Sequence, residues 1–194
     1  MRSLENPLRK GKRLRTIGFD DAPFSDGSEL VSISGVICSK TRFEGMVWGD
    51  IEKDGLDVNE TICQLLAKSK FLEQLNLLLT DGITFGGFNV VDLPYLAGEL
   101  QIPCIALMRR HPDLPKFFSA MEHVDRRDER KRRIEAAGPI HEQGGFFFQV
   151  AGCEVDQAAL ALQQVTDTGD VPEPLRLAHL IGAAVKLGES GKRA

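Results

Sequence analysis

The sequence lacks the features that mark membrane, exported or repetitive proteins. No stretch approaches the roughly 18 consecutive apolar residues of a membrane-spanning helix. Pro7 and the basic run RKGKRLR stand where an export signal would need an apolar segment. The 194 residues contain no internal repeat and no low-complexity tract. We therefore expect a cytoplasmic protein that folds unaided and does not associate with membranes.

Cysteine is also scarce, and its spacing excludes most cysteine chemistry. The four cysteines, Cys38, Cys63, Cys104 and Cys153, form no C-x-x-C pair and stand mostly in apolar segments. This pattern indicates reduced thiols in the core rather than disulfides or a zinc site. Neither of the glycine-rich nucleotide motifs, G-x-x-x-x-G-K-[ST] and G-x-G-x-x-G, occurs.

The formal net charge of −4 conceals an uneven distribution. Residues 1–16 carry six basic side chains against Glu5 alone, so this segment is +5 and the remaining chain is −9. We assign residues 1–13 to a basic N-terminal arm. With Arg13 and Arg15 at its base, such an arm can hold the phosphate backbone of a nucleic acid, or it can be a solvated, frayed terminus.

The spacing of apolar residues predicts an α/β fold for residues 14–194. The predicted order is three strands, then αβαβ, then mostly helices, and the first two connections are too short for crossovers. Such an order builds a mixed sheet with an antiparallel edge and helices on both faces, which is the layout of the ribonuclease H-like fold. The predicted strands span 14–19, 31–38, 43–51, 75–82, 104–108 and 146–151, and the predicted helices lie near 57–69, 90–100, 114–137, 156–165 and after Pro172.

Two carboxylates follow neighbouring strands of this layout. Asp20 ends the first strand, within IGFDDAPF, and Asp81 ends the central strand, within LNLLLTDG. Two carboxylates this close repel each other unless a proton or a cation lies between them. Hard oxygen ligands suit Mg²⁺ or Mn²⁺. The alternative is ordinary turn chemistry, because Asp-Gly and Asp-Ala-Pro are common loop starts.

Three further residues are candidate metal ligands, and each allows a second interpretation. Asp57 and Glu60 have the spacing of a helix capping box, so either could be a third metal ligand or a cap. His179 lies on the flank of a helix whose apolar stripe runs through Leu177, Ile181, Ala184 and Val185, where it is a ligand candidate or simply solvated.

Basic and glycine residues at the same edge of the sheet are candidates for phosphate binding. Gly86 and Gly87 could let the backbone approach a phosphate, and Arg109 and Arg110 follow the strand CIALM. The run DRRDERKRRIE mixes six basic with four acidic groups and is typical of a solvated helix face.

Four motifs, in order, resemble a known family. GFDDAPF, TDGITFGGFNVVD, IPCIALMRRHPDLP and PEPLRLAHLIGAAV are similar to the endonuclease dU family, which is related to endonuclease V. The resemblance covers residues 14 to 192 and implies a ribonuclease H-like core with metal-dependent nicking of DNA near a deaminated base, here deoxyuridine. Asp20, Asp81 and His179 match motif positions of endonuclease V.

The resemblance also implies roles for less closely matched residues. Glu60 falls where the catalytic glutamate of endonuclease V is expected, with Asp57 as the alternative, and Arg109 falls where that enzyme has a lysine. No Pro-Tyr-Ile-Pro-like tract is present to wedge open a duplex, so we expect single-stranded or lesion-containing DNA as the partner. Asp21 is expected to support the site rather than bind metal. The alternatives are a noncatalytic nucleic-acid or nucleotide-binding module and a nuclease for inosine-containing DNA or RNA.

Overall fold

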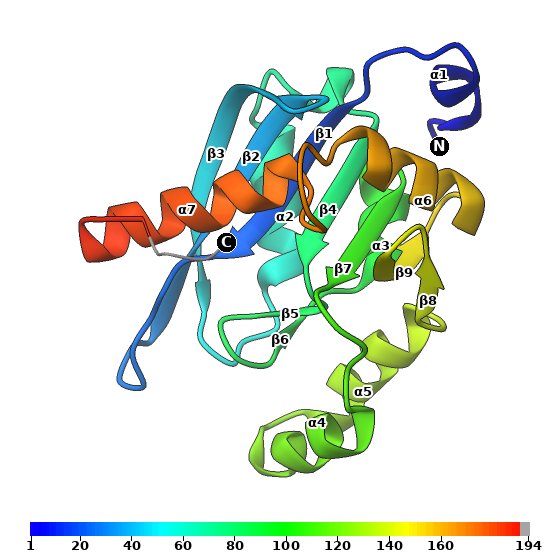
Figure 1. The fold of residues 1–194 in the computed structure, drawn as a ribbon. Helices are drawn as coiled ribbons and strands as arrows, with labels where there is room; N and C mark the ends of the chain where they lie inside the picture. Colours follow the sequence, from blue (N-terminus) through cyan, green and yellow to red (C-terminus); the bar gives the residue numbers. More distant parts are fainter. Residues whose placement is uncertain (191–194) are drawn as a thin grey trace.

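A computed structural model describes residues 1–190 and shows a mixed sheet between two layers of helices (Figure 1). The strands are β1 (Arg15–Asp21), β2 (Leu30–Ser39), β3 (Arg42–Glu52), β4 (Leu77–Asp81), β5 (Thr84–Phe85), β6 (Asn89–Val90), β7 (Cys104–Met108), β8 (His141–Gln143) and β9 (Phe146–Ala151). The helices are α1 (Glu5–Arg9), α2 (Val58–Ala67), α3 (Leu93–Leu100), α4 (Leu114–Ala120), α5 (Arg127–Ala136), α6 (Val155–Gln164) and α7 (Glu173–Leu187).

The strand order is β3-β2-β1-β4-β7-β9-β8, with β5 and β6 as a separate small hairpin. Strands β1, β4 and β7 are parallel to one another, whereas β2 and β3 on one side and β9 and β8 on the other run antiparallel to their neighbours. The predicted mixed sheet with an antiparallel edge is therefore confirmed. Its parallel centre brings the carboxyl ends of β1, β4 and β7 to one edge.

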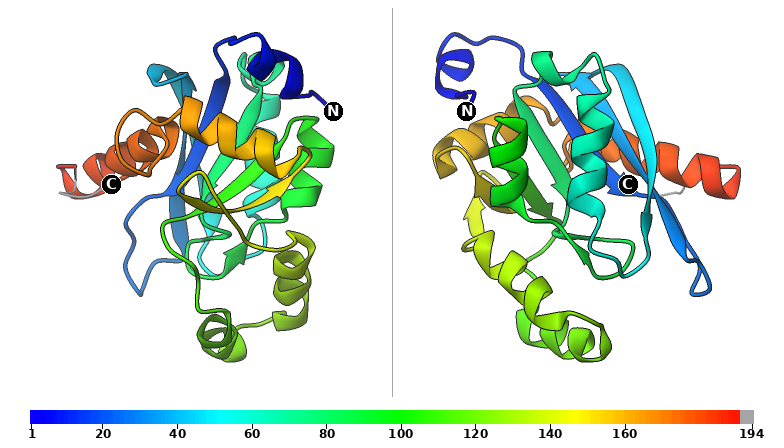
Figure 2. Two further views of the ribbon diagram at one scale, coloured as in Figure 1. Left: turned by 45° about the vertical axis from the view of Figure 1, so that its right-hand side comes forward. Right: turned by 180° about the vertical axis from the view of Figure 1, so that it is seen from behind.

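The two faces of the sheet are covered by different helices (Figure 2). Helices α2 and α3 pack on one face, around a cluster that includes Phe19, Ile33 and Leu78. Helices α1 and α6 and the start of α7 pack on the other, around Leu79 and Phe148. The central strand β4 is thus covered on both faces, as its leucine-rich sequence predicts.

The N-terminal segment packs against the rest of the domain, which corrects the alternative of a frayed terminus. Leu4 and Leu14 are fully buried. The Arg2 guanidinium donates to the carbonyl oxygens of Leu72 and Leu75 at 2.7 and 2.8 Å. Apolar side chains flanking the basic residues give this segment enough burial to fix it.

The base of this segment also lies far from the acidic residues. Arg15 begins β1 and pairs with Glu44 at 2.5 Å, whereas Asp20 lies near the other end of the same strand. At roughly 3.3 Å per residue, about 16 Å of strand separate them. Arg15 therefore does not lie beside Asp20, and nucleic-acid binding by Arg13 and Arg15 stays a prediction for a surface away from this edge.

The expected long helix over 114–137 is broken into α4, a short 3₁₀ turn and α5, and its basic run is only partly solvated. Arg130 is 2% exposed. Its guanidinium donates to the carbonyl oxygens of Gly55 at 2.6 Å and of Asp54 at 2.5 Å, and also to that of Phe88. One arginine of the run therefore cross-links two loops, which corrects the expectation of a fully solvated face.

The cysteines are all free thiols, as predicted. Cys38 and Cys104 are buried, while Cys63 and Cys153 are partly exposed. Burial raises the pKa of Cys38 to about 12 and the pKa of Cys63 to about 11. Among the described residues, no helix combines the length and apolar character needed to cross a membrane.

Candidate metal centre

Two aspartates meet at the carboxyl edge of the parallel strands. Phe19 of β1 is paired with Thr80 of β4, so Asp20 and Asp81, which follow them, emerge side by side. The side chain of Asp20 is 7% exposed and that of Asp81 is 17% exposed. The predicted juxtaposition of the two strand ends is confirmed.

Helix α7 reaches this edge because two glycines allow it to lie directly on β1. A methyl group at Gly18 would come within 2.7 Å of the backbone of Pro174 and Leu175, and one at Gly182 would lie 3.2 Å from Ala22. The hydroxyl of Ser34, which faces Asp20 in the sheet register, donates to the carbonyl oxygen of Ala178 at 2.8 Å. These contacts fix the position of α7 along β1.

The buried side of α7 differs from the predicted apolar stripe. The observed packing of the helix determines the direction of the His179 side chain. The buried residues are Pro174, Leu175, Ala178, Gly182 and Ala183. Val185, expected on the apolar stripe, is 61% exposed. Beyond Leu175, the buried residues Ala178, Gly182 and Ala183 are small, which lets the helix lie close to the sheet. His179, next to Ala178, is consequently turned toward Asp20, with Nδ1 2.9 Å from the Asp20 Oδ2 atom.

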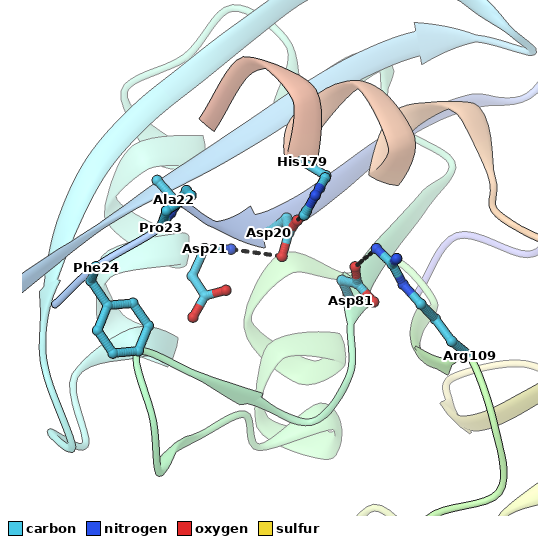
Figure 3. Close-up of a pocket in the computed structure, with 8 residues that line it drawn as sticks. All are labelled: Asp20, Asp21, Ala22, Pro23, Phe24, Asp81, Arg109 and His179. Atoms are coloured by element: carbon cyan, nitrogen blue, oxygen red, sulfur yellow. Dashed lines mark hydrogen bonds and ion pairs between the residues drawn. The ribbon is translucent and has the colours of Figure 1, made fainter. Parts of the chain in front are cut away.

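These residues form a compact set of metal-ligating atoms. In the part of the chain that the structure describes, three ligand atoms lie within 4.8 Å of one another, one each from Asp20, Asp81 and His179. Arg109, which follows β7, donates to Asp81 Oδ2 at 2.8 Å. Figure 3 shows these four side chains lining one pocket. The pocket has a volume of about 470 Å³. The pocket is lined by Asp20, Asp21, Ala22, Pro23, Phe24, Asp81, Arg109 and His179.

The electrostatics of the pocket favour an added positive charge. Burial, together with the nearby carboxylates of Asp81 and Asp21, raises the pKa of Asp20 to about 8. Burial lowers the pKa of Arg109, but the hydrogen bond to Asp81 and the negative charges of Asp81, Asp20 and Asp170 together outweigh burial, so the pKa is raised. One guanidinium thus offsets part of the negative charge of the carboxylates. A cation between Asp20 and Asp81 would stabilise both ionised forms.

Asp21 supports the turn beside the pocket, as predicted. Burial raises its pKa, while its Oδ2 atom accepts a hydrogen bond from the Gly86 backbone N–H at 2.6 Å. Gly86 is buried and its N–H donates to Asp21, so this amide is not free for a phosphate, and close approach of a phosphate to the Gly86–Gly87 backbone stays a prediction. Gly87 is exposed, with φ +89°, and a side chain there would meet Asp54 at 2.3 Å.

Asp57 and Glu60 lie outside the cluster, so the structure does not bring either predicted third carboxylate to Asp20 and Asp81. Asp57 makes no capping hydrogen bond and instead accepts from the Asn89 side chain at 2.6 Å and from the Glu52 N–H at 3.2 Å. Glu60 is exposed and lines a different pocket together with Asp57. The buried side chains of α2, Val58, Ile62 and Leu66, face the sheet and so turn Glu60 outward.

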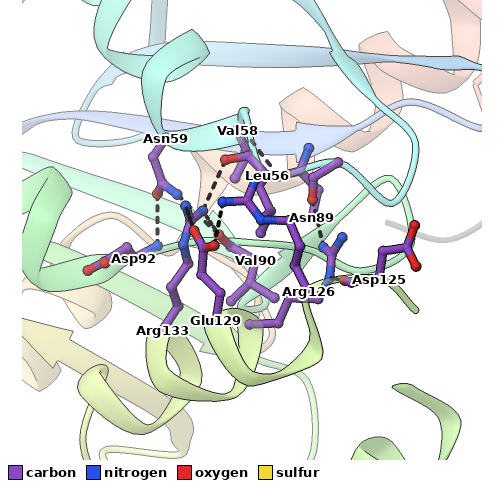
Figure 4. A network of polar contacts seen from close by, with 12 residues as sticks. Leu56, Val58, Asn59, Asn89, Val90, Asp92, Asp125, Arg126, Glu129 and Arg133 are labelled. Atoms are coloured by element: carbon purple, nitrogen blue, oxygen red, sulfur yellow. Dashed lines mark hydrogen bonds and ion pairs between the residues drawn. The ribbon is translucent and has the colours of Figure 1, made fainter. Parts of the chain in front are cut away.

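A polar network fills the region where this third carboxylate was expected (Figure 4). The Asn89 side chain accepts from the Val58 N–H at 3.1 Å and thereby holds the start of α2. Arg133 donates to the Leu56 carbonyl oxygen at 3.0 Å and pairs with Glu129 at 2.9 Å. The polar groups near the start of α2 therefore hold α5 against β6 and the loop before α2 and do not reach the metal-ligating cluster.

Two contributors to the site were not singled out from the sequence. Ser34 fixes α7, and its place opposite Asp20 depends on strand register. Phe24 lines the pocket from the loop after β1. It is the last residue of the motif GFDDAPF, which is the signal that could have identified it.

The mixed sheet flanked by helices, with carboxylates at the ends of adjoining parallel strands, defines a ribonuclease H-like domain with an acidic centre. Comparison with known proteins agrees, since residues 12–186 match the family described as endonuclease dU. The chain belongs to the endonuclease dU family.

Its relatives include a UPF0215 protein of Methanothermobacter thermautotrophicus, 39% identical over 187 residues that cover 91% of this chain and 90% of that protein. Another, from Methanopyrus kandleri, is 35% identical over 96% of this chain and 99% of the relative.

Solved structures support the same fold. A protein of unknown function from Archaeoglobus fulgidus has a TM-score of 0.85 and 34% identity, covering 89% of this chain and 98% of that one. Endonuclease V of Ciona intestinalis, in complex with a 24mer DNA that contains an inosine followed by a ribo-adenosine, has a TM-score of 0.58 at 16% identity, covering 87% of this chain and 84% of that one. Human endonuclease V has a TM-score of 0.59 at 14% identity, covering 93% and 89%. The family and the shared fold support a nuclease-like role.

Proposed function

We propose that this protein is a divalent-metal-dependent endonuclease that nicks DNA at or near deaminated bases, with deoxyuridine as the preferred lesion. The observation that carries the proposal is the clustering of Asp20, Asp81 and His179 ligand atoms within 4.8 Å at the carboxyl edge of the sheet. The name of the family and the fold shared with endonuclease V support this reaction class. The choice of lesion rests on the family alone.

The donor set fits Mg²⁺ or Mn²⁺. Two carboxylates and one imidazole are oxygen and nitrogen ligands that suit these ions, and Mn²⁺ accepts the imidazole more readily than Mg²⁺ does. Among residues 1–190, the hydrogen-bond partners of the nearly buried Asp20 carboxylate are the His179 ring and the Asp21 backbone N–H, so an added metal ion would balance its charge. When bound, the metal supplies an acidified water for hydrolysis and neutralises charge on the leaving oxygen.

The side chains of the pocket have separate tasks in this proposal. Asp20 and Asp81 hold the metal from two strands, and His179 completes the set from α7. Arg109 presents its guanidinium beside Asp81, where it can bind a non-bridging oxygen of the scissile phosphate through paired hydrogen bonds. Arg110, exposed at the next position, is placed to contact a neighbouring phosphate.

Single-stranded DNA and unpaired lesions are the proposed substrates. An unpaired deoxyuridine costs less to extrude than a paired one, because no base pair has to be broken. Inosine-containing nucleic acid is the alternative substrate, since the endonuclease V of Ciona intestinalis is in complex with such a DNA.

Cleavage of defined oligonucleotides tests the function. Labelled single strands and duplexes carrying one deoxyuridine, one inosine or neither are incubated with wild type in Mg²⁺, Mn²⁺ or EDTA. The proposal predicts metal-dependent nicks on the deoxyuridine strand and none in EDTA. Asp81→Asn should be inactive, whereas Glu60→Gln, which alters an exposed carboxylate outside the cluster, should cut like wild type. Intact substrate with wild type, or equal cutting by Asp81→Asn, would refute the assignment.

One observation favours a noncatalytic nucleic-acid-binding module as the second candidate. Within residues 1–190, the metal-ligating cluster contains two carboxylates and a histidine, and Glu60 does not reach it. A module of this kind would bind the same oligonucleotides with a salt-dependent affinity but would leave them uncut in every metal. The cleavage assay therefore separates the two functions directly.

Replacing Arg109 with glutamine is expected to weaken both phosphate binding and cleavage. One lost phosphate contact should reduce the slope of log K against log salt by about 0.7 for a single strand. Loss of its charge-assisted hydrogen bonds should lower kcat/KM by roughly 10- to 100-fold. Fluorescence anisotropy across a salt series and initial cleavage rates measure both. Arg42→Gln, an exposed arginine at the start of β3, is the matched control and should leave the slope unchanged.

A further inference from the structure

Phe24 is an exposed aromatic side chain that separates the candidate metal centre from a second pocket. It is 41% exposed on the loop after β1. Together with Pro23 it lines both the metal pocket and an adjoining pocket of about 330 Å³. Figure 3 shows its ring at one end of the metal pocket, with Asp81 and Arg109 at the other. The pocket therefore has an anion-binding end and an aromatic end.

The surroundings of the ring leave it available for stacking. The ammonium of Lys53 lies 5.8 Å from the ring centroid, and it is anchored by donating to the Asp26 carbonyl oxygen at 2.7 Å. A cation beside an aromatic ring contributes a weak attraction and adds positive charge at the rim. Burial does not explain why phenylalanine is at this position, because much of the ring faces solvent.

The second pocket combines apolar walls with hydrogen-bonding groups. Leu30 and Leu187 contribute exposed apolar surface, at 59% and 63% exposure. The hydroxyls of Ser25 and Ser28, which lie 3.1 Å apart, and the ammonium of Lys186 supply donors and acceptors. A flat heterocycle with polar edges matches this combination, since one surface can stack while its edge finds hydrogen bonds.

We propose that this second pocket, which we call the Phe24 groove, is a nucleobase-binding subsite in which a base stacks on Phe24 while a phosphate of the same strand lies at the metal centre. The inference rests on the proposed function and deepens it. Two observations favour a nucleobase over a protein partner. The groove adjoins the metal pocket, since Pro23 and Phe24 line both, and Lys53 and Lys186 place positive charge at its rim, which suits a polyanionic strand.

Binding measurements with Phe24→Leu test the subsite. Single-stranded oligonucleotides containing the fluorescent base 2-aminopurine are titrated with protein in EDTA, so that binding is read without cleavage. Loss of one stacking contact is expected to lower affinity by roughly 5- to 150-fold and to remove the 2-aminopurine quenching, whereas Phe24→Trp should retain both. Phe43→Leu alters another exposed phenylalanine, 48% exposed near the start of β3, and should bind like wild type.

Abasic substrates make the test specific for a base. An abasic residue is moved along the strand, one position at a time, through the sites flanking the nick. At one position, wild type and Phe24→Leu should bind with equal affinity, because no base is present to stack. Equal affinity of the two proteins at every position, including the fully base-containing strand, would overturn the inference. If wild type binds and discriminates in this way but cuts nothing, the proposed nuclease function fails while the subsite stands.

Discussion

Replacing Asp20 with asparagine is expected to abolish cleavage and to raise the melting temperature of the metal-free protein. The lost metal ligand should reduce activity by at least about 100-fold, because it removes several kcal/mol of transition-state stabilisation. The gain in stability has a separate origin. Burial beside Asp81 and Asp21 raises the pKa of Asp20 to about 8, so ionised Asp20 is destabilising in the absence of a cation.

The pH dependence of this stability gain has a defined sign. Between the ordinary pKa of an aspartate, 3.8, and the folded value of about 8, the folded state holds a proton that the unfolded state has lost. The stability of the wild type therefore falls as pH rises through this window. Asparagine removes the titration, so the advantage of Asp20→Asn should be small at pH 4 and largest at pH 8.

Melting curves at pH 5 and pH 8, with and without Mn²⁺, measure the effect. A difference of a few kcal/mol corresponds to roughly 5 to 10 °C for a domain of this size at pH 8. Mn²⁺ should stabilise the wild type and leave Asp20→Asn nearly unchanged. A metal-free Asp20→Asn protein that melts below wild type at pH 8 would contradict the account of Asp20.

Replacing Gly18 with alanine is expected to damage both stability and activity. The added methyl group would lie 2.7 Å from backbone atoms of Pro174 and Leu175, which cannot move aside as a flexible side chain could. Overpacking of this kind costs about 1 to 3 kcal/mol, or roughly 3 to 10 °C in melting temperature. Helix α7 must shift away from β1, and His179 moves with it away from Asp20.

The matched control is the same substitution at Gly98, in α3. A methyl group there meets no atom within 4 Å, so Gly98→Ala should be neutral or raise stability by up to about 1 kcal/mol, because alanine favours the helix. Differential scanning fluorimetry and cleavage rates on both variants measure the contrast. Equal stability of Gly18→Ala and wild type would show that α7 does not depend on this close approach.

The fold was predictable because its strands carry clear signals. The strands at 104–108 and 146–151 coincide with β7 and β9, and the order of elements was sufficient to place the ends of β1 and β4 together. Short elements such as β5, β6 and β8 escaped prediction, since two or three residues show no periodicity. Helix α1 was missed because five residues with a proline inside give too weak a helical signal.

Some residues of the candidate site could likewise be predicted from the sequence, whereas others could not. Asp20 and Asp81 could be predicted because strand order alone brings their strand ends together. The orientation of His179 could not be derived from helical periodicity, because Ala178, Gly182 and Ala183 are buried whereas Val185, expected on the apolar stripe, is exposed. The structure does not bring Glu60 to the aspartate pair, because Val58, Ile62 and Leu66 of α2 are buried and Glu60 lies on the exposed side of that helix.

Diffraction from a crystal soaked in Mn²⁺ tests the central claim most directly. Anomalous scattering locates manganese without assuming its position. The account predicts an anomalous peak from a Mn²⁺ ion bound by carboxylate oxygens of Asp20 and Asp81 and by a ring nitrogen of His179. A soaked crystal of Asp81→Asn should show no such peak. A wild-type crystal with no peak at these residues, or with its peak at Asp57 and Glu60 instead, would contradict the metal centre.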